Sequence, residues 1–170
     1  LPGQPQFLIV TELDPEIVPR PLDGPLLRVS EDFVTHRITI KGSFDEYLKQ
    51  RSNKFRANAK RRRNLLGRRG LAARLEVVTA ADQMAALVDD HARLERAGWK
   101  GAEGSAIDTA APSGRFYTSI MTEFARTGEA VGYRYFYDDQ IVATYLGIRT
   151  FGVEVALKWA YDETHGDTSP

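Results

Sequence analysis

Residues 153–170 read VEVALKWAYDETHGDTSP, an alternating segment followed by a Tyr-Asp-Glu corner and a final Ser-Pro. The alternation predicts a strand, and successive side chains of a strand point to opposite faces. One face carries Val153, Val155, Leu157, Trp159 and Tyr161, and the other carries Glu154, Ala156, Lys158, Ala160 and Asp162. We expect one face to pack against a core, which leaves the other face free for polar chemistry.

Two further strands are predicted just before this one, at residues 130–137 and 141–149. The connections at 138–140 and 150–152 are short enough to be hairpins, so the three strands form an antiparallel meander.

Upstream of the meander the hydrophobic pattern predicts a strand at residues 74–79 and two helices. Thr79 and Asp82 resemble a capping box that opens the first helix, which runs through Arg96. Ser113 caps the second helix and Gly128 ends it, with a loop at 98–112 between the two. The expected inner faces are Met84, Leu87, Val88, His91 and Leu94 in the first helix, and Phe116, Tyr117, Ile120, Met121 and Phe124 in the second.

The first 72 residues differ in composition from the rest. Six of the eight prolines fall within the first 25 residues, which predicts a lead-in or linker at 1–31. A strand is expected at 33–40, and Ser43 with Glu46 forms a capping box for a helix that runs to about Leu66. Its expected core-facing stripe is Phe44, Leu48, Phe55, Ala59 and Leu66. We therefore divide the chain into 1–31, a strand and basic helix at 32–72, and a domain at 73–170.

Charge is segregated along the chain although the net charge is zero. Residues 49–69 hold ten Lys or Arg and no acid, which leaves 13 basic and 23 acidic residues elsewhere. Arg51 and Arg62 interrupt the apolar stripe, and Arg56 and Arg61 lie nearby. Because burying an unpaired guanidinium is costly, we expect Arg51 and Arg62 to meet acids or a phosphate, with Arg56 and Arg61 as second contacts. The alternative for the other cations is a solvated helix face.

Composition is that of a folded domain. The chain has 170 residues, of which 42% are hydrophobic and 27% charged, enough for one core. It contains no Cys, which fits a reducing compartment such as the cytoplasm. We see no membrane span in the sequence, no metal-ligand spacing, and no serine-hydrolase, phosphate-loop or dinucleotide motif.

Four segments of the sequence resemble those of one family of acyltransferases. They are SFDEYLKQRSNKFRANAKRRRNLL (43–66), RLERAGWK (93–100), RFY (115–117) and LKWAYDE (157–163). They resemble the CelD/BcsL-like acetyltransferases, which are GNAT domains related to the FemAB-like aminoacyl ligases. The resemblance implies an α+β GNAT-like acyltransferase fold with a mixed, mostly antiparallel sheet and flanking helices.

The resemblance also implies a cofactor, acetyl-CoA or another acyl-CoA, and no metal. In the GNAT fold the thioester lies beside the fourth core strand, where Leu157 and Trp159 are the expected cofactor contacts. The pyrophosphate lies at the start of the following helix, which a Ser-Pro-Gly opens in relatives. Ser169 is the matching residue, and the expectation is that the sequence stops before this pyrophosphate-binding helix.

Acyl transfer to an amine needs an oriented acceptor, removal of its proton and a donor to the developing negative charge. The catalytic candidates are Asp162 as base or orienter, Tyr161 as acid for the leaving thiolate, and Lys158. The structural alternative is that Tyr161 packs in the core and Asp162 caps a turn. Trp99 and Lys100 are candidates for the acceptor cleft, although Trp99 at a helix end is also suited to covering the core.

Three functions remain open from the sequence. The first is transfer of an acyl group from coenzyme A to an amine or hydroxyl of a polysaccharide or cell-envelope precursor, with a small-molecule or glycan acceptor. The second uses aminoacyl-tRNA as donor, as FemAB-like relatives do, with the basic helix as an RNA contact. The third is a non-catalytic nucleic-acid-binding or scaffold module.

Overall fold

The computed structural model describes residue 19, residues 23–29 and residues 36–170. The chain divides into two compact units, Leu1–Tyr47 and Leu48–Pro170. Much of the expected lead-in at 1–31 and residues 33–35 of the expected strand lie outside the described residues. Residues 36–40 form no strand, so that part of the prediction is wrong; no described segment pairs with them, and an unpaired strand is not stable in water.

The capping box at Ser43 is confirmed. The Ser43 N–H donates to Oε2 of Glu46 at 2.6 Å, and the Glu46 N–H donates to Oγ of Ser43 at 3.3 Å. These contacts with Ser43 hold the pKa of Glu46 below its ordinary value. They open the short helix α1, Phe44–Lys49.

The single helix expected from Ser43 to Leu66 is two helices. The second, α2, is Asn53–Arg69, and Ser52 separates it from α1 with an extended backbone (ψ 154°). The Oγ of Ser52 accepts the Phe55 N–H at 3.2 Å, which favours a new helix start over continuation. The helix passes through Gly67 and ends at Gly70, whose left-handed backbone (φ 67°) a glycine adopts without strain. The expected core stripe is wrong, because no residue of α2 is buried.

The second unit contains a four-stranded antiparallel sheet in the order β1-β2-β3-β4. Its strands are β1 (Ala73–Val78), β2 (Ala130–Tyr137), β3 (Gln140–Thr150) and β4 (Val153–Tyr161), so the predicted meander is confirmed. Phe151 and Gly152 turn the second hairpin, both with positive φ. The fold is α+β and consistent with a GNAT-like fold.

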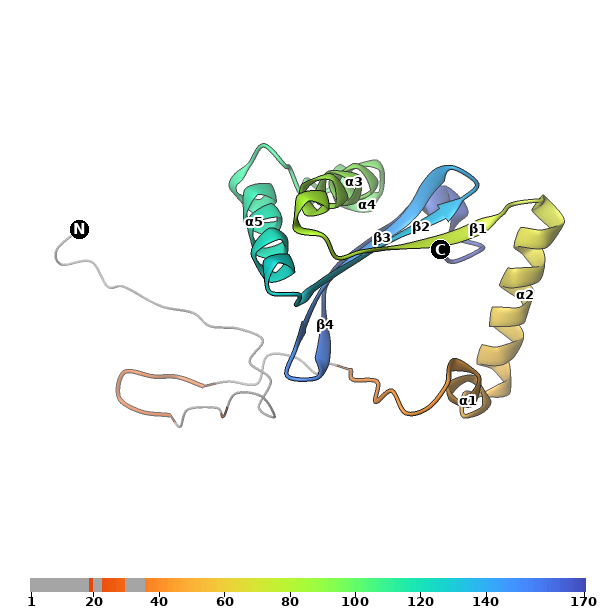
Figure 1. Cartoon of the computed structure of the whole chain (residues 1–170), viewed down its shortest axis with the longest axis horizontal. Coiled ribbons are helices and arrows are strands. Elements are labelled where there is room, and N and C mark those ends of the chain that lie inside the picture. The colour runs from red at the N-terminus through yellow and green to blue at the C-terminus, as the bar shows by residue number, and fades with distance from the viewer. Residues whose placement is uncertain (1–18, 20–22, 30–35) are drawn as a thin grey trace. The chain divides into compact units, whose positions relative to one another are not determined.

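Helices α3 (Met84–Ala97) and α5 (Pro112–Arg126) cover one face of the sheet (Figure 1). A 3-10 turn, η1 (Ala81–Gln83), precedes α3, and the short helix α4 (Trp99–Ala102) follows it inside the expected loop. The core between helices and sheet is built from Val78, Met84, Leu87, Val88, Met121, Ala130 and Leu146. A Cβ at Gly132 of β2 would lie 2.0 Å from Cδ2 of Leu87, so any larger residue there would force this buried side chain to move.

The inner faces of these helices were predicted well and their starts poorly. All five expected inner residues of α3 are buried, and four of those of α5 pack on the core. Phe116 is the exception at 58% exposed. Neither Thr79 nor Ser113 caps its helix: η1 begins after Ala80 and α5 after Ala111, both without a side-chain cap, and Pro112 supplies the preset backbone of the first turn instead. Gly128 does take the left-handed conformation, at φ 76°.

Candidate active site

A buried carboxylate lies where α3, α4 and β4 meet. The side chain of Glu95, near the end of α3, has no exposed surface. Its Oε2 accepts the Ile107 N–H at 2.9 Å, and its Oε1 accepts the ammonium groups of Lys100 from α4 and Lys158 from β4. The Lys158 bond is 3.2 Å long. One carboxylate therefore joins α3 to α4, to the loop at Ile107 and to the distant strand β4.

The two ammonium groups remain partly open to solvent. Their side chains are 24% exposed for Lys100 and 21% exposed for Lys158. Lys100 lies 5.8 Å from the ring centre of Trp99, and Lys158 lies 5.4 Å from that of Tyr117. Because the two lysines share one carboxylate, the three groups together keep a net positive charge. The ammonium groups also keep N–H donors that could form hydrogen bonds with a bound anion.

His91 lies one turn before Glu95 and is fully buried. Its Nδ1 shares a hydrogen bond of 3.0 Å with Oγ1 of Thr144 on β3. Its Nε2 lies 3.3 Å from Oε1 of Glu95 but outside hydrogen-bond geometry, so that contact is electrostatic. His91 thus lies between Thr144 of the sheet and the Glu95 carboxylate.

Glu95 is ionised in the folded protein. Burial of its carboxyl raises the pKa, but the contact with His91 and the hydrogen bonds from Lys100 and the Ile107 N–H together lower it by more than burial raises it. The pKa of Glu95 therefore lies well below its ordinary value of 4.5. At neutral pH the carboxylate is a fixed anchor for the two lysines and a weak base.

The free edge of β4 lies beside this cluster. Within the described residues β4 pairs only with β3, and the Asp162 N–H donates to the Val142 carbonyl at 2.8 Å. Backbone groups alternate in direction along an antiparallel strand, so those of Trp159 and Tyr161 face the open edge. These N–H and C=O groups fit the amide groups of an extended ligand such as the arm of coenzyme A.

A bulge interrupts β4 at Leu157. Leu146 pairs with Lys158 while Gly147 pairs with Ala156, so Leu157 is the extra residue. Strict alternation across the whole strand, as the sequence predicted, therefore does not hold. Leu157 packs against the core and Lys158 points to Glu95, both on the helix side, whereas Trp159 remains 65% exposed. Bulges re-aim side chains in this way and are common beside active sites.

Asp162 and Tyr161 lie at the end of β4. Oδ1 of Asp162 accepts the Thr164 N–H and hydroxyl at 2.9 and 2.6 Å, which opens the 3-10 turn η2 (Glu163–His165). Oδ2 of Asp162 accepts from Gln140 at 3.0 Å. The bonds from Thr164 hold the pKa of Asp162 below its ordinary value. These contacts are those of a turn cap, the structural alternative for Asp162, while Tyr161 is 41% exposed and does not pack in the core.

The remaining predicted residues are spread over the second unit. Ser169 is exposed with φ 53° next to Thr168, whose Oγ1 accepts the Tyr137 hydroxyl at 2.9 Å. Trp99 is 53% exposed, and its backbone N–H donates to Oε1 of Glu163 at 2.9 Å. The structure therefore brings Lys100, Trp99 and Lys158 together through Glu95, and Ser169 makes no hydrogen bond or ion pair with this group.

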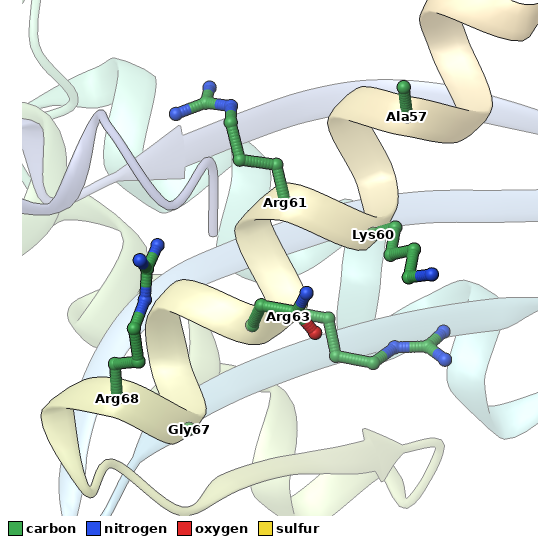
Figure 2. Close-up of a pocket in the computed structure, with 7 residues that line it drawn as sticks. Ala57, Lys60, Arg61, Arg63, Gly67 and Arg68 are labelled. Atoms are coloured by element: carbon green, nitrogen blue, oxygen red, sulfur yellow. The ribbon is translucent and has the colours of Figure 1, made fainter.

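The predicted cation patch lies on and before α2. Arg51 is exposed in the segment between the helices, and Arg56 donates to the Lys49 carbonyl at 2.8 Å and to Asn53. Arg62 is partly buried, and its Nε has no hydrogen-bond partner. A shallow hollow lies elsewhere on α2, lined by Ala57, Lys60, Arg61, Arg63, Asn64, Gly67 and Arg68 (Figure 2).

Glu95 and Thr144 were not predicted from the sequence. A signal for Glu95 was present: at 100° per residue it falls between Val88 and His91, within the expected inner face of α3. A charged residue at an inner position needs partners, because a buried unpaired charge is costly. No local pattern marks Thr144.

No group of three or more His, Asp or Glu that could hold a metal ion occurs in residues 36–170 or in the other described positions. None of the described helices is long and apolar enough to cross a bilayer.

Comparison with known proteins gives one match. The family described as acetyltransferase (GNAT) domain matches residues 53–170, which begins at the first residue of α2 and includes the whole sheet. No curated protein and no solved structure matches the chain. The match covers more than half of the sequence and the same helices and strands that surround Glu95 and β4. The chain belongs to the acetyltransferase (GNAT) domain family.

Proposed function

We propose that this protein transfers an acetyl or related acyl group from coenzyme A to an amine or hydroxyl of a polysaccharide or cell-envelope precursor, as the resemblance to CelD/BcsL-like proteins implies. The family match supports acyl transfer in general. The observation that carries the finer proposal is the pair of lysines, Lys100 and Lys158, held on buried Glu95 beside the free edge of β4.

The bound cofactor supplies a thioester, whose carbonyl carbon is open to attack by an amine or hydroxyl. The backbone groups of Trp159 and Tyr161 at the free edge would hold the cofactor arm, as a peptide is held by a sheet edge. We assign to Tyr161, which is exposed at the same edge, the role of giving a proton to the leaving sulfur, and its phenolate then regains the proton that the acceptor loses, through solvent. Asp162 fixes the corner after β4 through Thr164 and Gln140, so its role is to orient Tyr161.

Lys158 and Lys100 would bind and orient the acceptor. Their excess charge suits a carboxylate or phosphate on the acceptor, and the rings of Trp99 and Tyr117 flank the two ammonium groups. Because Glu95 is buried and ionised, it fixes both ammonium groups before the acceptor arrives. Such preorganisation lowers the entropy lost when the acceptor is positioned.

The test is thiol release from acetyl-CoA with a panel of amino sugars, some neutral and some carrying a phosphate or carboxylate. Lys100→Met and Lys158→Met should each raise KM for the charged acceptors about 10-fold or more, since a hydrogen bond to a charged group contributes about 1.5–3 kcal/mol. KM for neutral acceptors should change little. Lys54→Met, which removes an exposed lysine of α2, is the matched control.

Two results would refute parts of this proposal separately. Absence of thiol release with every acceptor, together with no acetyl-CoA binding, would refute the transferase function. Release that depends on neither lysine, or that falls equally for neutral and charged acceptors, would refute the acceptor site and leave the transferase standing.

A further inference from the structure

Helix α2 has an unusual surface. It contains eight Lys or Arg among its 17 residues, no acid, and no buried residue. Like charges on one helix destabilise it unless counter-ions or a partner neutralise them. Of the eight, Arg69 is paired with Asp167, at 3.1 Å for one of its two bonds. Arg56 donates to the Lys49 carbonyl and to Asn53, and among the described residues none of these seven other cations forms an ion pair with an acid.

Four of these cations surround the hollow shown in Figure 2. Ala57, Asn64 and Gly67 fall within about 80° of one another around the helix, so small side chains form its floor. Arg61 and Arg68 project from one side of this floor, and Lys60 and Arg63 from the other (Figure 2). None of the four makes a hydrogen bond or ion pair with another residue in the part of the chain that the structure describes. Their donors are free for a ligand.

We propose that this hollow, the α2 groove, binds the phosphodiester backbone of a single-stranded nucleic acid. The groove runs from Ala57 to Arg68, about 16 Å at 1.5 Å per residue, which exceeds the size of one phosphate and suits several in a row. One pair of cations on each side of the floor places positive charge along both sides of an extended strand. The site acts independently of the acyl-transfer function proposed above.

The groove recognises the negative charge of the phosphates and does not distinguish between bases. Its lining contains no aromatic residue, so it lacks the stacking surfaces through which single-strand binders hold bases. Lys and Arg contacts to phosphates are independent of sequence. Binding should therefore be similar for RNA and DNA of different sequence, and should weaken steeply with salt.

A lipid surface fits this helix less well. A helix that lies on a membrane inserts its apolar face and keeps its cations at the sides of that face. Phe55, Ala59 and Leu66 lie on the side of the helix opposite the floor of the groove, Leu65 lies between the two sides, and Ala57 is part of the floor. If that side entered a bilayer, the groove would point away from the lipid headgroups.

The test is fluorescence anisotropy of the purified chain with labelled oligouridylate and oligothymidylate over about 50 to 200 mM salt. Four phosphate contacts predict a slope of log K against log salt of about −2.8. The variant K60Q/R61Q/R63Q/R68Q should bind at least about 10-fold more weakly and lose most of this slope. Gln matches Lys and Arg in helix propensity, so α2 should persist, which circular dichroism verifies.

The matched control, R93Q/R96Q/R115Q/R126Q, removes the same charge from the exposed surfaces of α3 and α5. It should reduce affinity no more than about 2-fold. Equal loss in the two variants would show that only net charge matters and would overturn the proposal. Absence of binding by the wild-type chain would overturn it too, as would tighter, groove-dependent binding to phosphatidylserine vesicles, which would assign the groove to a membrane.

Discussion

At the scale of residues, the candidate site depends on a charge in the core. Glu95 is fully buried, and its partners Lys100, Ile107 and Lys158 lie 5, 12 and 63 residues away in the sequence. The helical periodicity could place Glu95 on the inner face of α3. It could not identify the partners of Glu95, because these residues come together only when the sheet has formed. Lys158 was predicted as a site residue from the polar face of its strand, and Lys100 from its place at the start of a loop, without the carboxylate that holds them.

Replacing Glu95 by Gln should destabilise the fold by about 1–3 kcal/mol at neutral pH, because buried polar groups lose charge-assisted partners. The pKa of Glu95 is lower in the folded state than its ordinary value of 4.5. Its stabilisation is therefore complete above that value and is lost as pH falls, since the unfolded state takes up the proton first. Urea unfolding from about pH 7 to pH 3 should show a smaller acid loss in Glu95→Gln than in wild type.

Glu123→Gln is the control for this prediction. Glu123 is an exposed member of an ion pair with Arg126 on α5, and such surface pairs contribute less than about 1 kcal/mol. If both substitutions had the same small effect at every pH, Glu95 would not be the anchor described here.

At the scale of elements, periodic segments were predictable and their ends were not. The meander and the inner faces of α3 and α5 follow from alternation and from the 3.6-residue repeat, which depend on burial along a whole element. Caps depend on the backbone conformation of one residue. Ser43 caps as predicted, whereas Thr79 and Ser113 do not, and Ser52 divides one expected helix into two.

Ser52→Ala should weaken the first turn of α2 by about 1 kcal/mol, since the Oγ acceptor for the Phe55 N–H is lost. Because α2 has no buried residue, the global melting temperature should hardly change. Amide hydrogen exchange should accelerate about 5-fold in that turn. Ser119→Ala, in an exposed position inside α5, should leave exchange there unchanged or slower; acceleration in both variants would argue against a capping role.

At the scale of the whole molecule, the charge segregation seen in the sequence becomes a structural division. The basic segment forms the exposed helix α2, while the core lies between α3, α5 and the sheet. The composition revealed this segregation. It did not reveal that the apolar stripe of α2 would not be buried, because burial of the stripe depends on whether another element packs against the helix.

The chain from Arg51 onward should fold without the preceding residues. The second compact unit begins at Leu48 and the family match at residue 53, and among the residues that the structure describes none before them belongs to the core. We expect the free energy of unfolding of this fragment to be lower by less than about 1 kcal/mol than that of the full chain, which corresponds to a few degrees in melting temperature by calorimetry. A fragment that fails to show a cooperative transition would indicate that residues 1–50 belong to the same folding unit.

The central claim is that the free edge of β4 holds an acyl-CoA beside the lysines anchored on Glu95. Residue-resolved amide hydrogen exchange by NMR, with and without saturating acetyl-CoA, tests it most directly. The amides of Trp159 and Tyr161 face the open edge, so acetyl-CoA should slow their exchange at least about 10-fold, while those of Lys158 and Ala160, which point toward β3, change little. Unchanged exchange at Trp159 and Tyr161 in the presence of bound acetyl-CoA, or no binding at all, would contradict the account.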